Sequence, residues 1–145
     1  MQDEQGVSLR LFDLAMKTVL FICAQNSGLS QMAEAFFNQL AKGKAMAISA
    51  GTQPAAQVNS TVVAAMREVG MEIGDQKPKP LTLEMLGSAD RVLTMGCNVA
   101  EACPASFVPT EYWELDDPEG KPMEKVRRIR GEIEAKADEL ARTLL

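Results

Sequence analysis

The stretch that decides the fold is TVLFICAQNSGLSQMAEAFF, residues 18–37. Residues 18–22 form an apolar run rich in β-branched and aromatic side chains, which predicts a buried strand that ends at Cys23. From Ser30 onward the apolar residues recur with helical spacing, which predicts a helix with Ser27 or Ser30 as its N-cap. The order is therefore strand, loop and helix, with a cysteine at the head of the loop.

A loop between a strand and the start of a helix is a favourable place for an anion. Unpaired backbone N–H groups and the positive end of the helix dipole point into it, and they also favour the thiolate of Cys23. A nucleotide P-loop is excluded, because no Gly-Lys-Ser/Thr follows. The alternative is that Cys23 is a small buried apolar residue at a strand end. Small side chains suited to wrapping an oxyanion are Asn26, Ser27, Gly28 and Ser30.

The composition predicts one soluble domain. The chain has 145 residues, 46% of them apolar, which is enough for one core; we expect a domain at residues 16–145 after a flexible extension at residues 1–15. The net charge of −5, without a block of Lys or Arg, argues against nucleic acid as a partner. No apolar run is long enough to span a membrane and no signal peptide is recognisable, so we predict a cytoplasmic protein without a membrane partner.

Histidine is absent, so acid–base roles fall to other side chains such as carboxylates. The three cysteines, Cys23, Cys97 and Cys103, are too few for a structural zinc site and odd in number for a disulfide framework. Transient thiol chemistry in a reducing compartment remains. We expect no cofactor and no bound metal.

The rest of the chain alternates strands and helices. The predicted strands cover residues 45–50, 91–95 and 111–115, and the predicted helices cover residues 59–70, 81–86 and 123–144. This alternation predicts a single α/β domain with a parallel four-stranded sheet and helices on both faces. Ligands of such sheets bind beyond the carboxyl ends of the strands, where Cys23, Cys97 and Asp117 all fall.

These groups suit attack on a tetrahedral oxyanion. A thiolate at Cys23 is the nucleophile, and the leaving oxygen needs a proton donor. Asp117, held by Pro118, is the candidate acid, with a plain turn as the alternative for this Asp-Asp-Pro sequence.

The loop resembles the signature loop of the low-molecular-weight protein tyrosine phosphatases, and more closely that of the arsenate reductases that share their fold. In that pattern a strand leads into Cys, five residues, Arg and Ser, followed by a helix start like Gln31-Met-Ala-Glu34. The resemblance implies a flavodoxin-like fold of the low-molecular-weight phosphatase type and an oxyanion, arsenate or phosphate, in the loop. The residues that would bind it are Ala24, Gln25, Asn26, Ser27, Gly28, Leu29 and Ser30.

The resemblance also implies a thiol relay that reduces arsenate to arsenite. Cys23 attacks arsenate, Asp117 protonates the departing oxygen, and Cys97 attacks Cys23 to expel arsenite. Cys103 then forms a disulfide with Cys97, which thioredoxin or a low-molecular-weight thiol reduces. The alternative for Cys97 and Cys103 is a pair of buried structural thiols. We expect the protein to act as a monomer.

Leu29 departs from the pattern, because it occupies the position of the family arginine. The chain is then an impaired or repurposed member, an engineered one, or one in which Lys79 or Arg91 supplies the cation. Two other functions remain open: a phosphatase, which hydrolyses its cysteine-bound intermediate with water, and an inactive oxyanion-binding or sensor protein. Some family members bind potassium near the loop. The matching positions are Asn26, Glu34 and Ser49, with Lys79 in place of an acidic residue, so that its ammonium could replace the ion.

Overall fold

The computed structural model describes residues 16–96 and 110–145. The predicted extension at residues 1–15 and two of the predicted redox cysteines, Cys97 and Cys103, lie outside the described residues. In chain order the elements are β1 (Lys17–Cys23), α2 (Leu29–Ala41), β2 (Ala45–Gly51), α3 (Ser60–Glu68), α4 (Leu83–Ser88), β3 (Arg91–Met95), β4 (Thr110–Trp113) and α6 (Met123–Leu144).

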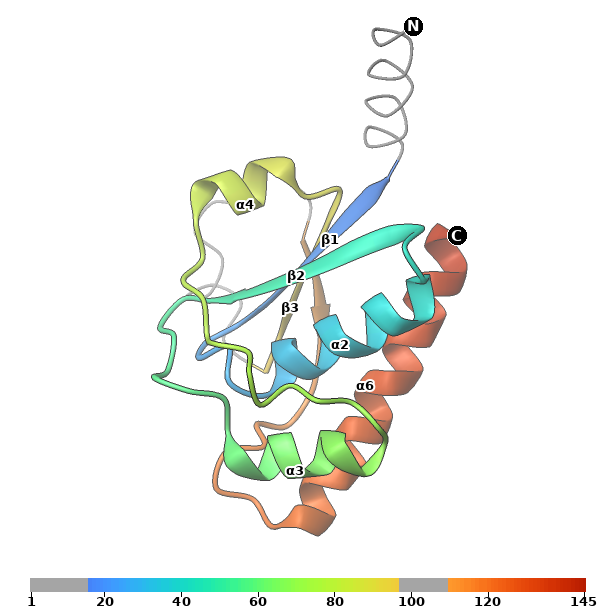
Figure 1. The fold of residues 1–145 in the computed structure, drawn as a ribbon. Helices are drawn as coiled ribbons and strands as arrows, with labels where there is room; N and C mark the ends of the chain where they lie inside the picture. The colour runs from blue at the N-terminus through green and yellow to red at the C-terminus, as the bar shows by residue number, and fades with distance from the viewer. Residues whose placement is uncertain (1–15, 97–109) are drawn as a thin grey trace, which may run out of the picture.

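The four strands form one parallel sheet in the order β2-β1-β3-β4. Helix α2 carries the chain from β1 to β2 on one side, and the chain then returns to β3 on the other side of β1 (Figure 1). A reversal of this kind opens a crevice at the carboxyl ends of the strands. Cys23 ends β1 at this edge, and Met95 ends the neighbouring β3.

Helices cover both faces of the sheet, as predicted. Because side chains alternate along a strand, Phe21 and Cys23 of β1 face the core shared with α2, α3 and α6, whereas Leu20 and Ile22 face a smaller core with Leu86 of α4. Figure 1 shows α4 on one side of the sheet and the other three helices opposite it. The predicted flavodoxin-like α/β class is confirmed.

Helix α6 packs along α2 and α3. Its apolar residues recur every three or four positions, so that one stripe faces the core and charged side chains cover the rest. The fully buried members of the stripe are Val126, Ile129, Ile133 and Ala137.

The predicted boundaries need small corrections. Strand β4 ends at Trp113, two residues before the predicted end, because its partner β3 ends at Met95, which pairs with Trp113. Helix α4 begins at Leu83 because Thr82 caps it, accepting a hydrogen bond from the N–H of Met85 at 3.1 Å. Helix α3 ends at Glu68 rather than at the predicted residue 70.

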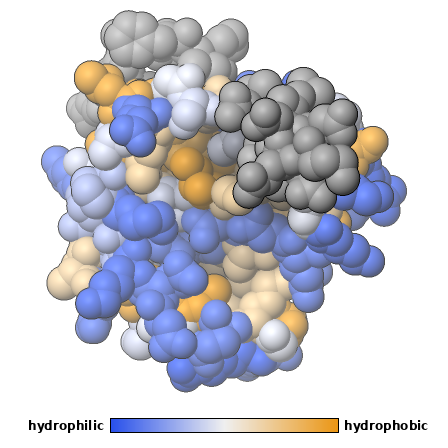
Figure 2. All heavy atoms as spheres, turned by 45° about the horizontal axis from the view of Figure 1, so that its top comes forward, coloured by the Kyte–Doolittle hydropathy of each residue, from blue (hydrophilic) through white to orange (hydrophobic). Residues whose placement is uncertain are grey.

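The face of the molecule drawn in Figure 2 is mainly polar. Figure 2 shows a face on which hydrophilic side chains predominate and apolar ones occupy small separate areas. Among the described residues, no helix has both the length and the apolar character that a bilayer crossing requires.

Candidate active site

The loop after β1 is held open by its neighbours. Its carbonyl groups turn outward: those of Cys23, Ala24, Gln25 and Ser27 accept N–H groups of Thr52, Gln53, Ala55 and Asn59 at 2.8 to 3.3 Å. In a trans peptide unit the N–H points opposite to the C=O, so the amides of the same units point into the loop. These hydrogen bonds to the carbonyl groups therefore explain why backbone N–H groups point into the loop, as the sequence predicted.

Helix α2 begins at Leu29, and its N-cap is Gly28. The predicted N-caps, Ser27 and Ser30, are wrong: Ser27 donates to the side chain of Gln25 at 3.4 Å, and Ser30 lies inside the first turn. Because glycine has no side chain, none caps the helix, and its first N–H groups stay available to a ligand.

The sulfur of Cys23 has two hydrogen-bonding partners. The Sγ atom lies 2.8 Å from the Oγ of Ser30 and accepts the backbone N–H of Asn26 at 3.2 Å. The side-chain amide of Asn26 donates to the Ser30 oxygen at 2.7 Å, which directs the hydroxyl hydrogen of Ser30 toward the sulfur. Cys23 is only 6% exposed, so these donors stabilise negative charge on a largely buried sulfur.

Asn26 is itself fixed from two sides. Its backbone adopts the left-handed conformation, with a φ of 51°, which asparagine tolerates better than most residues. Its Oδ1 accepts the side-chain amide of Gln31 at 3.1 Å and the backbone N–H of Lys79 at 2.9 Å. Asn26 and Ser30 are fully buried, so they orient the sulfur rather than line the cavity.

Asp117 reaches the same site from the loop before α6. Its Oδ1 accepts the N–H of Glu119 at 3.0 Å. Pro118 packs so closely on Gly28 that a Cβ at Gly28 would lie 2.8 Å from the proline Cγ. Glycine at this position therefore lets the loop of the candidate acid approach the loop of the thiol.

A cavity of about 30 Å³ lies between these loops. Cys23, Asn59, Gly96 and residues 117–119 line it, together with Ala24, Gln25, Ser27, Gly28 and Leu29 from the loop. Of the predicted anion-binding residues, five therefore border the cavity, whereas Asn26 and Ser30 lie behind it. The candidate nucleophile Cys23 and the candidate acid Asp117 therefore both line one small cavity.

Leu29 forms an apolar part of the wall. It is 4% exposed and belongs to the core. A Cβ on Gly96 would overlap the Cδ1 of Leu29, so the leucine packs directly on this glycine at the end of β3. The side chain therefore has two roles: it borders the cavity and closes the core beneath it.

Residues 18–145 match the family of low molecular weight phosphotyrosine protein phosphatases. The chain belongs to this phosphatase family. Within it, a glutaredoxin arsenate reductase from Synechocystis sp. is 36% identical over 129 residues, which cover 86% of this chain and 96% of that protein.

Two solved structures of this family have the same fold. An arsenate reductase in the phosphate binding state is 34% identical, with a TM-score of 0.79, over 90% of this chain and all (100%) of that one. The thioredoxin-dependent arsenate reductase of Corynebacterium glutamicum is 35% identical, with a TM-score of 0.76, over 89% of this chain and 62% of that chain.

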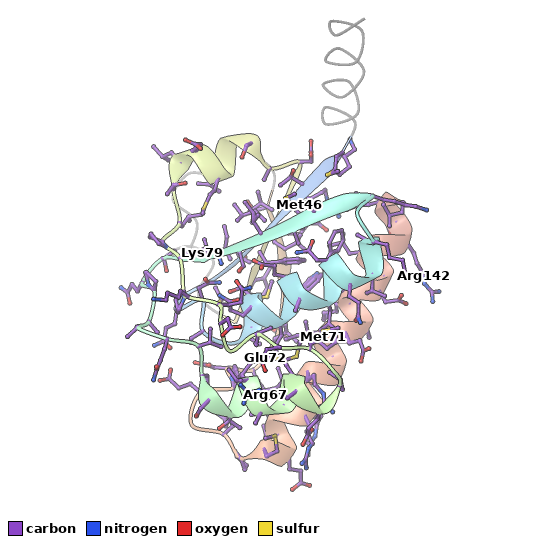
Figure 3. The ribbon with its side chains drawn as sticks, viewed as in Figure 1. Met46, Arg67, Met71, Glu72, Lys79 and Arg142 are labelled. Carbon is purple, nitrogen blue, oxygen red and sulfur yellow. The ribbon has the colours of Figure 1, made fainter. Side chains whose placement is uncertain are left out.

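Lys79 and Arg91, the two candidates for supplying a cation in place of the family arginine, lie outside the cavity. Arg91 starts β3, at the opposite end of the strand from the cavity, and its Nε donates to Glu111 at 2.6 Å. Lys79 lies beside the end of β2 (Figure 3), with its Nζ 3.8 Å from the Oε1 of Glu34. Neither residue lines the cavity.

The residues that match the potassium site of some family members do come together. Ser49 donates to Glu34 at 2.7 Å, and the ammonium of Lys79 approaches the same carboxylate oxygen. An ammonium and a potassium ion would compete for this oxygen, so the residues do not fit an added potassium ion.

Gln31 belongs to this phosphatase-family site, although its sequence position did not mark it as a site residue. It is 1% exposed, and its amide donates to both the side chain and the backbone carbonyl of Asn26, at 3.1 and 3.3 Å. A polar residue inside the apolar pattern of a helix start was the available signal, because burial of an amide requires a specific partner.

Proposed function

We propose that this protein reduces arsenate to arsenite with cysteine thiols. The observation that carries the proposal is the position of Cys23. Its sulfur lies 2.8 Å from the hydroxyl oxygen of Ser30, accepts the backbone N–H of Asn26, and borders a small cavity that Asp117 also lines. The relatives named as arsenate reductases, which match most of the chain, support this activity over others of the family.

The first step forms a bond between sulfur and arsenic. The sulfur of Cys23 attacks the arsenic atom, and the departing oxygen takes a proton from Asp117 and leaves as water. Inward amides of the loop hold the remaining oxygens, because oriented N–H groups stabilise the charge that develops there. Arsenic is still pentavalent at this stage.

The second step transfers two electrons. We propose Cys97 as the second thiol: its sulfur attacks the sulfur of Cys23, the S–As bond breaks, and its electron pair remains on arsenic, which leaves as arsenite. Two thiols are thereby oxidised to a disulfide. Cys103 then exchanges with this disulfide and frees Cys23, leaving a disulfide between Cys97 and Cys103.

An external thiol system must reduce the final disulfide. Two relatives are named for different systems, glutaredoxin for the Synechocystis protein and thioredoxin for the Corynebacterium protein. We propose that a reductant of this class serves a monomeric protein in the cytoplasm, where disulfides are kept reduced. Leu29 provides no guanidinium, so we expect slower turnover than in relatives that carry the arginine.

The test measures arsenite formation by the full chain with NADPH, thioredoxin reductase and thioredoxin, or with glutathione and glutaredoxin. Hydrolysis of p-nitrophenyl phosphate is measured in parallel. We expect arsenite with at least one reductant, none from Cys23→Ser, and no repeated turnover by Cys97→Ser or Cys103→Ser. Peptide mapping after turnover should find Cys97 linked to Cys103.

Each other outcome points to a different function. Hydrolysis of the phosphate ester without arsenite would make the protein a phosphatase. Anion binding without either reaction would make it a binding or sensor protein. Arsenite formation by the Cys97→Ser variant at the normal rate would contradict the relay, although not the reduction itself.

A further inference from the structure

The charges around the cavity are unusual for an oxyanion site. Among the described residues that line it, none is a lysine or arginine, and the charged ones are Asp117 and Glu119. The stretch at residues 97–109, which lies outside the described residues, has no lysine or arginine in its sequence. The ligand therefore meets neutral donors and two carboxylates in the described wall.

Three lysines, Lys121 and Lys125 from the segment after Asp117 and Lys79 from the segment that binds Asn26, interact with carboxylates other than Asp117 and Glu119. Lys125 bonds to Asp116 at 2.7 Å, and its hydrogen bond and charge hold the pKa of that aspartate below its ordinary value. Lys121 acts more weakly on the same aspartate. Lys79 faces Glu34, as described above. Asp117, next in sequence to Asp116, bonds to a backbone N–H instead.

Leu29 contributes no positive charge to the cavity wall. Its buried side chain presents hydrocarbon where it borders the cavity, and its packing on Gly96 keeps it in place. The loop amides and the start of α2 supply partial positive charge, but these dipoles do not carry a full unit of charge. Opposing them are the carboxylate of Glu119 and, whenever they are ionised, Asp117 and Cys23. Each additional negative charge on a bound ligand is therefore unfavourable.

We infer that the cavity between these loops binds a singly charged tetrahedral oxyanion, of the form H₂XO₄⁻, in preference to the doubly charged form. The inference rests on the proposed function for the identity of the substrate, which would be the singly charged form of arsenate. The cavity selects this form because its donors are neutral, its wall at Leu29 is apolar, and Glu119 adds a negative charge, as does Asp117 whenever it is ionised.

Two anions of fixed charge test the inference without any reductant. Perchlorate and sulfate are both tetrahedral, and at neutral pH they carry one and two negative charges. The measured quantity is the concentration of each that protects Cys23 from alkylation by iodoacetamide at low ionic strength, where screening is weak. We expect perchlorate to protect the wild-type protein at lower concentration than sulfate.

Perchlorate and sulfate also differ in hydration, and this difference alone could cause a preference. Variants that change the charge of the cavity show how much of the preference is due to charge. Leu29→Arg should reduce the preference for perchlorate on the order of tenfold relative to Leu29→Met, which keeps the volume without adding charge. Glu119→Gln should shift the preference in the same direction. Glu132→Gln, an equal change of charge on an exposed face of α6, should leave it unaltered. Thermal unfolding of each variant establishes that it is folded.

Two results would overturn the inference. One is that sulfate protects the wild-type protein at lower concentration than perchlorate does. The other is that the ratio of the two protecting concentrations is the same in Leu29→Arg and Glu119→Gln as in the controls, Leu29→Met and Glu132→Gln. If Leu29→Arg does not fold, the pair at Glu119 and Glu132 decides. The ranking of the two anions is measured without turnover. A failure to form arsenite would therefore contradict the proposed function, whereas the protection experiment alone decides the anion preference.

Discussion

The side chain of Leu29 occupies the space that a Cβ on Gly96 would need. Leu29 is the first residue of α2, and Gly96 follows the end of β3, so this contact joins the helix start to the neighbouring strand. Gly96 also has a φ of +65°, which favours glycine. Both the backbone and the packing therefore require glycine here.

Gly96→Ala should destabilise the protein by about 1–3 kcal/mol, because the new methyl group meets Leu29 and the backbone is strained. Urea unfolding followed by circular dichroism measures the change. Leu29→Ala creates room, so in the double variant the cost of adding the alanine should be smaller. An equal cost in both backgrounds would show that only the backbone conformation matters. Gly87→Ala, where a Cβ meets no atom within 4 Å, is the matched control.

The second prediction concerns the arginine that the resemblance of the loop to the family pattern implies at position 29. If the cavity lacks only a guanidinium, Leu29→Arg should raise arsenate reduction by about a hundredfold or more, because the thiol, the amides and Asp117 are in place. Arsenite formation is compared with Leu29→Met as the uncharged control and Cys23→Ser as the blank. The buried position of Leu29 allows another result: an arginine forced toward Gly96 would lower stability without increasing the rate.

The third prediction concerns Ser30. Ser30→Ala removes the hydroxyl that lies 2.8 Å from the sulfur and leaves the Asn26 amide without its acceptor. A lost hydrogen bond to a charged group is worth about 1.5–3 kcal/mol, so alkylation of Cys23 at neutral pH and arsenite formation should slow by roughly tenfold or more. Ser88→Ala, at the exposed end of α4, is the control. An unchanged rate of alkylation would show that the N–H of Asn26 alone is enough to maintain the reactivity of the Cys23 sulfur.

The sequence predicts the fold well because the core pattern is local. Helix α6 shows its apolar stripe directly, and the strands appear as short runs between helices, so the parallel sheet follows from their alternation. The position of Cys23 and Asp117 at one edge follows from topology alone. Their shared cavity agrees with that expectation.

Other features depend on contacts that no local pattern reveals. Gly28 is the N-cap although two serines flank the start of the helix, because Ser30 is turned toward the sulfur of Cys23. Gln31 is buried because it holds Asn26. The position of Lys79, whose backbone N–H binds Asn26 from a distant segment, required the three-dimensional structure.

The last prediction concerns the ion pairs that join α3 to α6. The Oε2 of Glu68 lies 2.8 Å from Nη2 of Arg127, and its Oε1 lies 2.8 Å from Nη1 of Arg130, which also donates to the carbonyl of Ala65 at 2.7 Å. The hydrogen bonds from Arg127 and then Arg130 lower the pKa of Glu68 to about 2. Because the folded-state pKa lies below the ordinary value, the ionised carboxylate stabilises the fold above that value, and the contribution is lost as the pH falls toward 2.

Glu68→Gln should therefore lower the Tm at neutral pH, and the difference from the wild type should narrow as the pH falls below the ordinary value of 4.5. Measuring both proteins at each pH cancels the titration of the other carboxylates, which they share. Glu132→Gln, exposed on α6, should give a small difference that does not vary with pH in this way. A Tm difference at Glu68 that is equally large near pH 2 and at neutral pH would mean that shape and hydrogen bonding, rather than the charge of the carboxylate, join the two helices.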